Sequence, residues 1–291
     1  MLRRPLEFGL SLVPATDDLD RIRTLARTAD EAGLDLLGIQ DHPYQQRFLD
    51  TWMLLATLLA ETERIRVFPD VANLPLRPPA LIAKAAATLD RLSGGRFELG
   101  LGAGAFWEGI VAMGGEERTP RDALAALAEA IEIVRLVWSG QRAVRFDGEH
   151  YRLAGLHPGP EPAHPIEIWL GVYKPRGLDL VGRRADGWVP SLGYAPPERI
   201  AEGQRRIDAA ADEAGRDPAA IRRLYNVSGT ITDGARGELL EGPAEYWAET
   251  LAEWATELHV DTFVFWPRDA TASQVEAFAA DVVPAVRAAT A

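Results

Sequence analysis

The sequence of 291 residues contains no cysteine. This absence excludes disulfides, iron–sulfur clusters and any metal site or nucleophile that depends on a thiolate. The sequence also has no stretch that approaches the roughly 18 consecutive apolar residues of a membrane-spanning helix. Its first residues lack the apolar run of a signal peptide. We therefore expect a cytoplasmic protein that does not interact with membranes.

Positive charge is also scarce, because 31 Lys and Arg are outnumbered by 43 Asp and Glu, for a net charge of −12. A protein that binds nucleic acid needs a positive surface, so we do not expect nucleic acid as a partner. The sequence has no H-E-x-x-H or H-x-H spacing, no nucleophile elbow and no Walker A loop. We expect no bound metal and a small organic molecule as substrate, with a metal-dependent barrel hydrolase as a minor alternative.

The chain alternates short β-branched or aromatic runs with longer amphipathic segments along its whole length. Eight such pairs in one chain favour a closed (β/α)₈ TIM barrel over an open doubly wound sheet. We expect a single domain over residues 1–291. The expected strands lie at 8–13, 36–40, 65–68, 97–101, 166–172, 187–190, 225–231 and 262–266, and the helices at 17–32, 49–62, 79–92, 119–138, 175–184, 197–214, 243–257 and 272–283.

One long excursion interrupts this alternation. Residues 143–153 have the pattern of a β-hairpin with Asp147-Gly148 as its turn, and a proline-rich connector follows over 156–165. The hairpin is expected as an insertion after the fourth β/α unit. Long loops in barrels often cover the active site.

Active sites of such barrels lie at the carboxyl ends of the strands. Asp41 and His42 end the second expected strand and place a carboxylate beside an imidazole that titrates near neutral pH. They are our candidate catalytic pair. A structural role, in which His42 caps the strand and bonds to the backbone, is equally consistent with the pattern.

Two glycine-containing segments are candidates for cofactor binding. Gly102-Ala103-Gly104 ends the fourth strand, where glycines allow a flat ring or a phosphate to approach the backbone. The G-x-G-x-x-G spacing fails at Ala105, so the dinucleotide signal is weak. The second segment leads into a helix whose N-terminus, flanked by two cations, suits a phosphate, although a capped helix with exposed cations has the same pattern. It comprises Gly171, Val172, Tyr173, Lys174, Pro175, Arg176 and Gly177.

The stretch from Asn73 to Gly104 contains Asn73-Leu-Pro-Leu-Arg77-Pro-Pro79 and Ser93-Gly-Gly-Arg-Phe-Glu-Leu-Gly100. It resembles the signature of the luciferase-like flavin-dependent oxidoreductases, and residues 144–153 and 165–194 are also similar to that family. The family binds FMN or the deazaflavin coenzyme F420. The Asp41-His42 pair, the short chain and the segment 169–176 resemble the F420-dependent branch. The resemblance thus implies F420 as cofactor, with FMN as the alternative.

The resemblance further implies a non-prolyl cis peptide at Asp70–Val71, in a bulge that backs the cofactor ring. Asp70, Val71, Ala72 and Asn73 would lie behind the ring, Gly102–Gly104 beside it, and Gly171–Gly177 at the phosphate. Asp41 and His42 would bond the ring or the substrate. Four aromatic side chains are candidates for apolar walls of the site, or equally for core packing. They are Tyr44, Phe106, Trp107 and Trp266.

The activity implied by the resemblance is hydride transfer between F420 and a small organic substrate. An FMN monooxygenase, supplied with reduced flavin by a partner reductase, is the alternative, and a non-catalytic cofactor-binding barrel is a third. Sugar-phosphate dehydrogenases of the family have a glutamate where this sequence has Ala105, with Glu108 three residues further on. That departure makes the glucose 6-phosphate reaction doubtful. The family also implies a homodimer.

Overall fold

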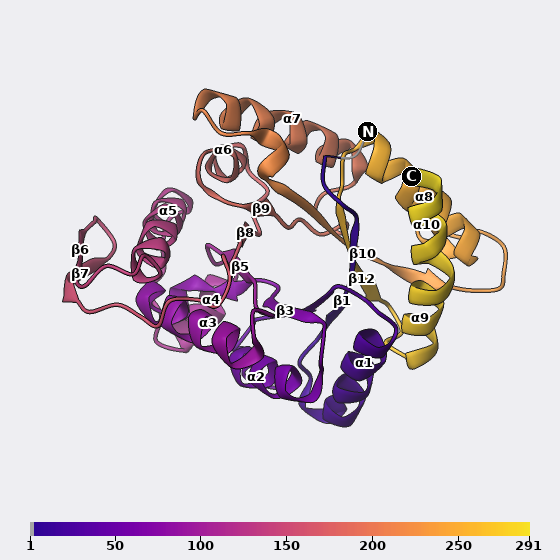
Figure 1. Ribbon diagram of the computed structural model, residues 1–291, viewed down its shortest axis with the longest axis horizontal. Coiled ribbons are helices and arrows are strands. Elements are labelled where there is room, and N and C mark those ends of the chain that lie inside the picture. Colours follow the sequence, from indigo (N-terminus) through magenta and orange to yellow (C-terminus); the bar gives the residue numbers. More distant parts are fainter. Residues whose placement is uncertain (1–2) are drawn as a thin grey trace.

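The computed structural model describes residues 3–291. Parallel strands form a ring at the centre of the molecule, and helices surround this ring (Figure 1). The order of the strands around the ring is β3-β2-β1-β12-β10-β9-β8-β5-β4. Their bounds are β1 (Glu7–Leu12), β2 (Leu36–Ile39), β3 (Arg66–Pro69), β4 (Ala72–Asn73), β5 (Leu99–Gly102), β8 (Ile168–Leu170), β9 (Gly187–Trp188), β10 (Arg222–Ile231) and β12 (Thr262–Pro267), with a short β11 (Glu241–Gly242) beside β10.

The two ends of this path are one chain segment. β3 pairs with β2, and β4 pairs with β5 after a two-residue break at Asp70 and Val71. A further parallel bridge joins Val67 to Phe97, just before β5. The ring of strands therefore closes on itself, and the predicted TIM-barrel architecture is confirmed.

The helices follow the strands as the sequence predicts, and local signals set their ends. Asp50 caps the second helix by accepting from the amides of Trp52 and Met53, and Gly94 ends the third in a left-handed conformation (φ 71°). The main helices are α1 (Leu19–Glu31), α2 (Thr51–Glu61), α3 (Pro79–Ser93), α5 (Pro120–Val137), α6 (Pro175–Arg184), α7 (Pro197–Glu213), α8 (Ala244–Glu257), α9 (Ala272–Ala277) and α10 (Val283–Thr290). Within the described residues, no helix is both long and apolar enough to cross a membrane.

Three expectations about element bounds were wrong. A short helix, α4 (Trp107–Ala112), follows β5 at residues where we predicted no helix. The last helix does not end at residue 283, because a π-helical turn at Phe278–Val282 joins α9 to α10. β10 begins at Arg222 rather than at 225, because Arg222 and Arg223, which lie outside the predicted strand, are buried within it.

The hairpin consists of antiparallel strands β6 (Val144–Asp147) and β7 (Arg152–Leu156). It lies between α5 and β8 in the chain and at the left edge of the molecule in Figure 1. Its position leaves the centre of the barrel to the side chains of the strands themselves.

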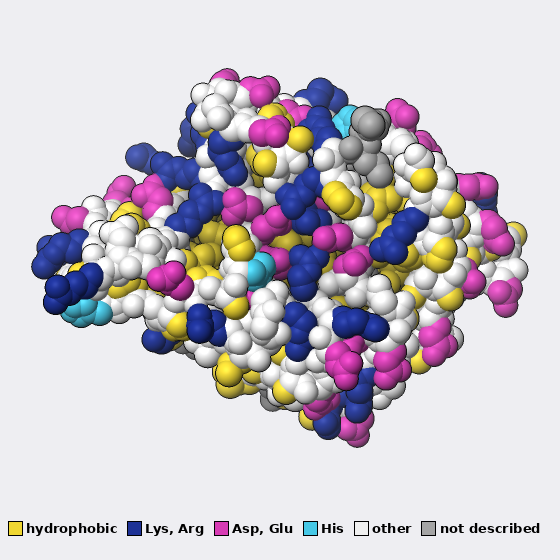
Figure 2. All heavy atoms as spheres, in the orientation of Figure 1, with side chains coloured by type: hydrophobic (Ala, Val, Ile, Leu, Met, Phe, Trp, Pro, Cys, Tyr) yellow, Lys and Arg dark blue, Asp and Glu magenta, His cyan; other side chains and the backbone are white. Residues whose placement is uncertain are grey.

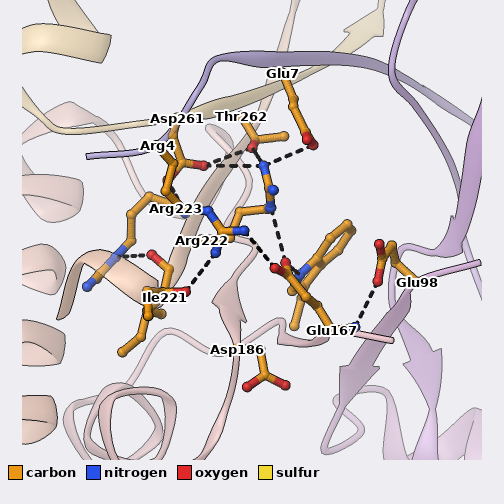
Figure 3. Close-up of polar contacts among 12 residues, drawn as sticks. Arg4, Glu7, Glu98, Glu167, Asp186, Ile221, Arg222, Arg223, Asp261 and Thr262 are labelled. Carbon is orange, nitrogen blue, oxygen red and sulfur yellow. Dashed lines mark hydrogen bonds and ion pairs between the residues drawn. The ribbon is translucent and has the colours of Figure 1, made fainter. Parts of the chain in front are cut away.

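Side chains that point into the barrel form three layers, because alternate residues of a strand face the same side. The first layer, at the amino ends of the strands, is charged: Arg222 bonds to Glu7 at 2.9 Å and to Glu167 at 3.1 Å. Figure 3 shows its guanidinium between these carboxylates, and Figure 2 shows acidic and basic side chains interleaved at the centre of this face. Arg66 extends the network to Glu98.

The second layer is apolar and fully packed, and it separates the charged end from the opposite end of the barrel. Two residues further along the strands, the third layer contains small and polar side chains. The apolar layer consists of Leu36, Phe68, Trp169, Val189, Leu224 and Val264. The polar layer consists of Ser11, Asp70, Ser191 and Asn226, which hydrogen-bond to one another.

Candidate active site

The polar layer lies at the carboxyl ends of the strands, where barrels place their active sites. Asp70 is its centre. Ser11 Oγ donates to the Asp70 carboxylate at 3.1 Å, and Asn226 Nδ2 donates to both of its oxygens at 3.1 and 3.0 Å. The same Asn226 amide donates to Ser191 Oγ at 3.1 Å. Side chains from two strands, β1 and β10, thus bond to one carboxylate, which itself follows β3.

Burial controls the protonation of this carboxylate. Removal from water raises the pKa of Asp70 to about 6, although the hydrogen bonds from Asn226 and Ser11 act in the opposite direction. No cation among residues 3–291 forms an ion pair with Asp70. A half-buried carboxyl that has no cationic partner, and whose pKa is raised towards neutrality, is typical of a functional site rather than of a stabilising contact.

The bulge between β3 and β4 places Asp70. The Asp70–Val71 peptide is cis, as predicted. The side chain of Val71 fills a space that exists only because two neighbouring residues are glycines: a Cβ atom on Gly102 would lie 2.8 Å from Val71 Cγ2, and one on Gly171 would lie 2.9 Å from it. These two glycines, which we predicted as cofactor contacts, therefore have a first role in seating the bulge.

Asp41 supports the other end of the bulge. Its side chain is 1% exposed, and its carboxylate accepts from the backbone N–H of Asn73 at 2.9 Å. Arg77 donates to both of its oxygens at 3.2 Å and also bonds to Asp50 at 2.6 Å. The structure thus directs the Asp41 carboxylate towards the bulge and Arg77, and does not pair it with His42.

His42 is partly buried beside two aromatic rings. Its Nδ1 lies 2.8 Å from the hydroxyl of Tyr44, whose ring packs 5.3 Å from that of Phe106. Its other nitrogen, Nε2, has no hydrogen-bond partner within the described part of the chain. Burial lowers the pKa of His42, so the imidazole is neutral at neutral pH and can accept a proton.

The segment after β5 forms one side of the site. Gly104 has a φ of 92°, and a Cβ atom there would lie 2.6 Å from Pro75, so only glycine fits. Ala103 is partly exposed beside it. Phe106 is 49% exposed, whereas Trp107 and Trp266 are half-buried. Glu108 is exposed in the first turn of α4.

The predicted phosphate-binding segment leads into α6. Lys174 and Arg176 are exposed at the N-terminus of this helix, and neither forms an ion pair with another described residue. Val172 and Gly177 are buried against each other, and Pro175 is the first residue of the helix. Tyr173 turns inward instead, where its hydroxyl accepts from the Ser191 amide at 3.2 Å, next to the polar layer.

The site contains buried polar atoms that the protein itself does not satisfy. Asn73 is 5% exposed and Asn226 is 3% exposed, yet the side-chain oxygen of each accepts no hydrogen bond. Such atoms are costly unless a ligand or water supplies a donor. Together with the exposed cations of α6, they fit a ligand that has N–H or O–H donors at one end and a negative charge at the other.

Sequence reasoning missed one residue of this site altogether. Ser11 and Ser191 lie near the carboxyl ends of predicted strands, so the rule that barrel active sites lie at these ends can select them. Asn226 instead lies near the middle of β10, four residues after Arg222. Only its alternation with the buried residues Arg222 and Leu224 could have indicated that it points into the barrel.

Comparison with known proteins places this geometry in a family. Residues 5–282 match the luciferase-like monooxygenase family. A 5,10-methylenetetrahydromethanopterin reductase from Archaeoglobus fulgidus is 31% identical over 228 residues, which are 78% of this chain and 64% of the reductase. An F420-dependent glucose-6-phosphate dehydrogenase from Nocardia farcinica is 31% identical over 233 residues, which are 77% of this chain and 68% of that enzyme. The chain therefore spans about two thirds of the length of these relatives.

Solved structures share the fold at lower sequence identity. An F420-dependent secondary alcohol dehydrogenase, in complex with an F420–acetone adduct, superposes with a TM-score of 0.86 at 18% identity and covers 98% of this chain and 100% of its own. The oxygenating constituent of a diketocamphane monooxygenase from Pseudomonas putida, in complex with FMN, gives a TM-score of 0.78 at 19% identity, covering 97% and 98%. The family match over nearly the whole chain shows that this protein belongs to the luciferase-like monooxygenase family.

Proposed function

We propose that this protein transfers a hydride between coenzyme F420 and a small organic substrate. As a member of the family it is an oxidoreductase that uses F420 or FMN. The main observation in favour of F420 is the similarity to the F420-dependent glucose-6-phosphate dehydrogenase. This enzyme is 31% identical over 77% of the present chain. The Asp41-His42 pair, which resembles that of F420-dependent members, supports it.

The residues of the barrel mouth suit each part of such a cofactor. Asp70, Val71, Ala72 and Asn73 would lie behind the ring, and Gly102, Ala103 and Gly104 beside it. Lys174 and Arg176, at the N-terminus of α6, would attract its phosphate. When bound, the deazaflavin supplies a carbon centre that donates or accepts a hydride and reacts poorly with oxygen.

The chain's own side chains would manage the proton that accompanies the hydride. His42 is neutral and has Nε2 free, so it can accept a proton from a substrate hydroxyl, with Tyr44 holding Nδ1. Asp41 acts as a positioning residue, because it fixes the bulge through Asn73 and Arg77. Phe106 and Tyr44 would exclude water from this side.

An FMN monooxygenase is the second candidate function. It is favoured by the similarity of the fold to that of an FMN-bound monooxygenase component, and it would require a reductase partner that supplies reduced flavin. The purified protein titrated with F420 and, separately, with FMN distinguishes the two. We expect a dissociation constant for F420 at least about tenfold below that for FMN, measured by the change in fluorescence of each cofactor. Tighter binding of FMN would replace the proposal by the monooxygenase, and binding of neither would remove both.

One departure of the sequence argues against the substrate of the sugar-phosphate relatives. The resemblance implies that Ala105 takes the position of their glutamate, and Glu108, the nearest following carboxylate, is exposed on α4. We therefore do not propose glucose 6-phosphate as the substrate.

The proposed phosphate-binding site, formed by Lys174 and Arg176 at the N-terminus of α6, gives a first mutational prediction. Replacing both Lys174 and Arg176 by alanine should raise the dissociation constant for the cofactor about tenfold, because two exposed cations each contribute roughly 0.7 kcal/mol to binding a phosphate. The difference between variant and wild type should shrink as salt is added. Arg183 and Arg184 at the other end of α6 provide the control, because they already pair with Glu213 and Glu132. If the two double variants raised the dissociation constant equally, the phosphate would not bind at the N-terminus of α6.

We further propose a homodimer that uses the outer face of α2 and α3. Met53 is 67% exposed and Leu81 61% exposed in the first turns of these neighbouring helices, and Leu92 is 80% exposed at the end of α3. α2 is apolar around most of its circumference, which is typical of a helix that is covered on both sides. Sedimentation should show a dimer that dissociates in the Met53→Lys, Leu81→Lys variant. A wild-type monomer at micromolar concentration would disprove this assembly.

A further inference from the structure

The polar layer has hydrogen-bond acceptors that none of residues 3–291 uses. Asp70 Oδ1 receives a single hydrogen bond, from Asn226 at 3.1 Å, and so retains a lone pair. The Asn226 side chain is 3% exposed and directs its nitrogen to Asp70 and Ser191, which leaves its oxygen buried and without a donor. Two adjacent side chains therefore present acceptors at the end of the barrel where the bulge lies.

These acceptors are oriented by the protein and are not a by-product of packing. Ser11 on β1 and Asn226 on β10 hold Asp70 from two sides, and Gly38 on β2 leaves room for it, since a Cβ atom there would lie 3.1 Å from Asp70 Cβ. An aspartate that only stabilised the fold would be expected to have a cation as partner, and none of the described residues supplies one. The missing component is a hydrogen-bond donor.

We infer that Asp70 and Asn226 accept a hydrogen bond from the imide N–H of the bound cofactor ring. This inference rests on the proposed function. Asp70 belongs to the bulge that would back the ring, so a ring held there would be nearer to its side chain than a substrate beyond the ring would be. Deazaflavin and flavin rings both carry this imide, with one N–H between two carbonyls, and the Ser191 hydroxyl, which accepts from Asn226, can donate to such a carbonyl.

The ionised carboxylate is the stronger acceptor, so cofactor affinity should depend on pH. Few groups near Asp70 could titrate together with it. Tyr173, after β8, is the only titratable one among the described neighbours, and burial raises its pKa, away from neutral pH. The other groups that face Asp70 do not titrate near neutral pH: Ser11 from β1, Gly38 from β2, Ser191 after β9 and Asn226 from β10. Because the pKa of Asp70 is about 6, the carboxylate is present above that pH and is lost as the pH falls through it.

The test compares wild type with Asp70→Asn, using fluorescence titrations with F420 and with FMN between about pH 5 and pH 8. We expect the wild-type dissociation constant to rise about tenfold as the pH falls across this range, which is the effect of losing one charge-assisted hydrogen bond. The variant should bind about tenfold more weakly at pH 8 and show little change with pH. Asp70→Ser serves as a second variant, and thermal melting checks that both are folded.

Two controls identify the donor and the acceptor. Asp35→Asn removes a carboxyl whose pKa is also raised by burial, but at the opposite end of the barrel, where it accepts from the Phe8 amide, and it should leave cofactor affinity unchanged. An FMN analogue methylated at the imide nitrogen should lose affinity for wild type and lose none further in Asp70→Asn. Equal affinities of wild type and Asp70→Asn for both cofactors would overturn the inference. The wild-type titration alone decides the proposed function, so the two can fail separately.

Discussion

Replacement of Arg77 by methionine should lower the free energy of unfolding by about 3–5 kcal/mol, which is the cost of removing one partner from a buried ion pair. The Asp41 carboxylate is 1% exposed and would keep only the Asn73 amide as a donor. Methionine retains much of the apolar length of arginine, so lost packing against Trp52 contributes less to the change. Urea unfolding near neutral pH measures the difference.

The control is Arg47→Met. The Arg47 side chain is 76% exposed and pairs with an exposed aspartate, so its loss should change the free energy of unfolding by less than about 1 kcal/mol. A double variant that also carries Asp41→Asn should regain part of the stability, because the uncompensated charge is gone. If Arg77→Met is no more destabilising than Arg47→Met, the ion pair does not hold the bulge in the way described.

Replacement of His42 by alanine should reduce turnover on the order of 10²- to 10⁴-fold, the usual contribution of a positioned acid or base. The cofactor dissociation constant should change by less than about threefold, since the imidazole is expected to act on the substrate. The assay follows the absorbance of F420 with the compound that gives the highest wild-type rate in a panel of short secondary alcohols and their ketones. His157→Ala, at an exposed histidine of the hairpin connector, is the matched control.

The pH profile provides an independent readout of the same residue. Burial lowers the pKa of His42, so the proton-accepting form persists to more acidic pH than it would for an exposed imidazole. The rate of substrate oxidation by wild type should therefore fall only on the acidic side of the ordinary histidine range, and the rate of His42→Ala should lack this acidic decrease. A reduction of less than tenfold, or an unchanged profile, would argue against His42 as the proton acceptor.

The sequence by itself was enough to determine the barrel. Its eight strands and their helices follow from periodicity and from local signals such as the Asp50 cap and the Gly94 terminator, which act within a few residues of one another. The bulge at Asp70–Val71 was located from the resemblance carried by Asn73 and Arg77. In a parallel barrel the carboxyl ends of all strands lie on one face. The candidate positions at the carboxyl ends of β2, β3, β5 and β8 could therefore be named from the sequence.

Only the tertiary structure decided what each of these residues does. Asp41 and Asp70 look alike in the sequence, yet one is paired with Arg77 and the other meets only Ser11 and Asn226. Asp70 and Asn226 are 156 residues apart, and their contact depends on the closure and register of the whole ring. The alternation of residues along a strand indicates whether a side chain points into the barrel. It does not indicate which distant side chain it contacts there. That pairing sets whether a carboxylate stabilises the fold or is left available to a ligand.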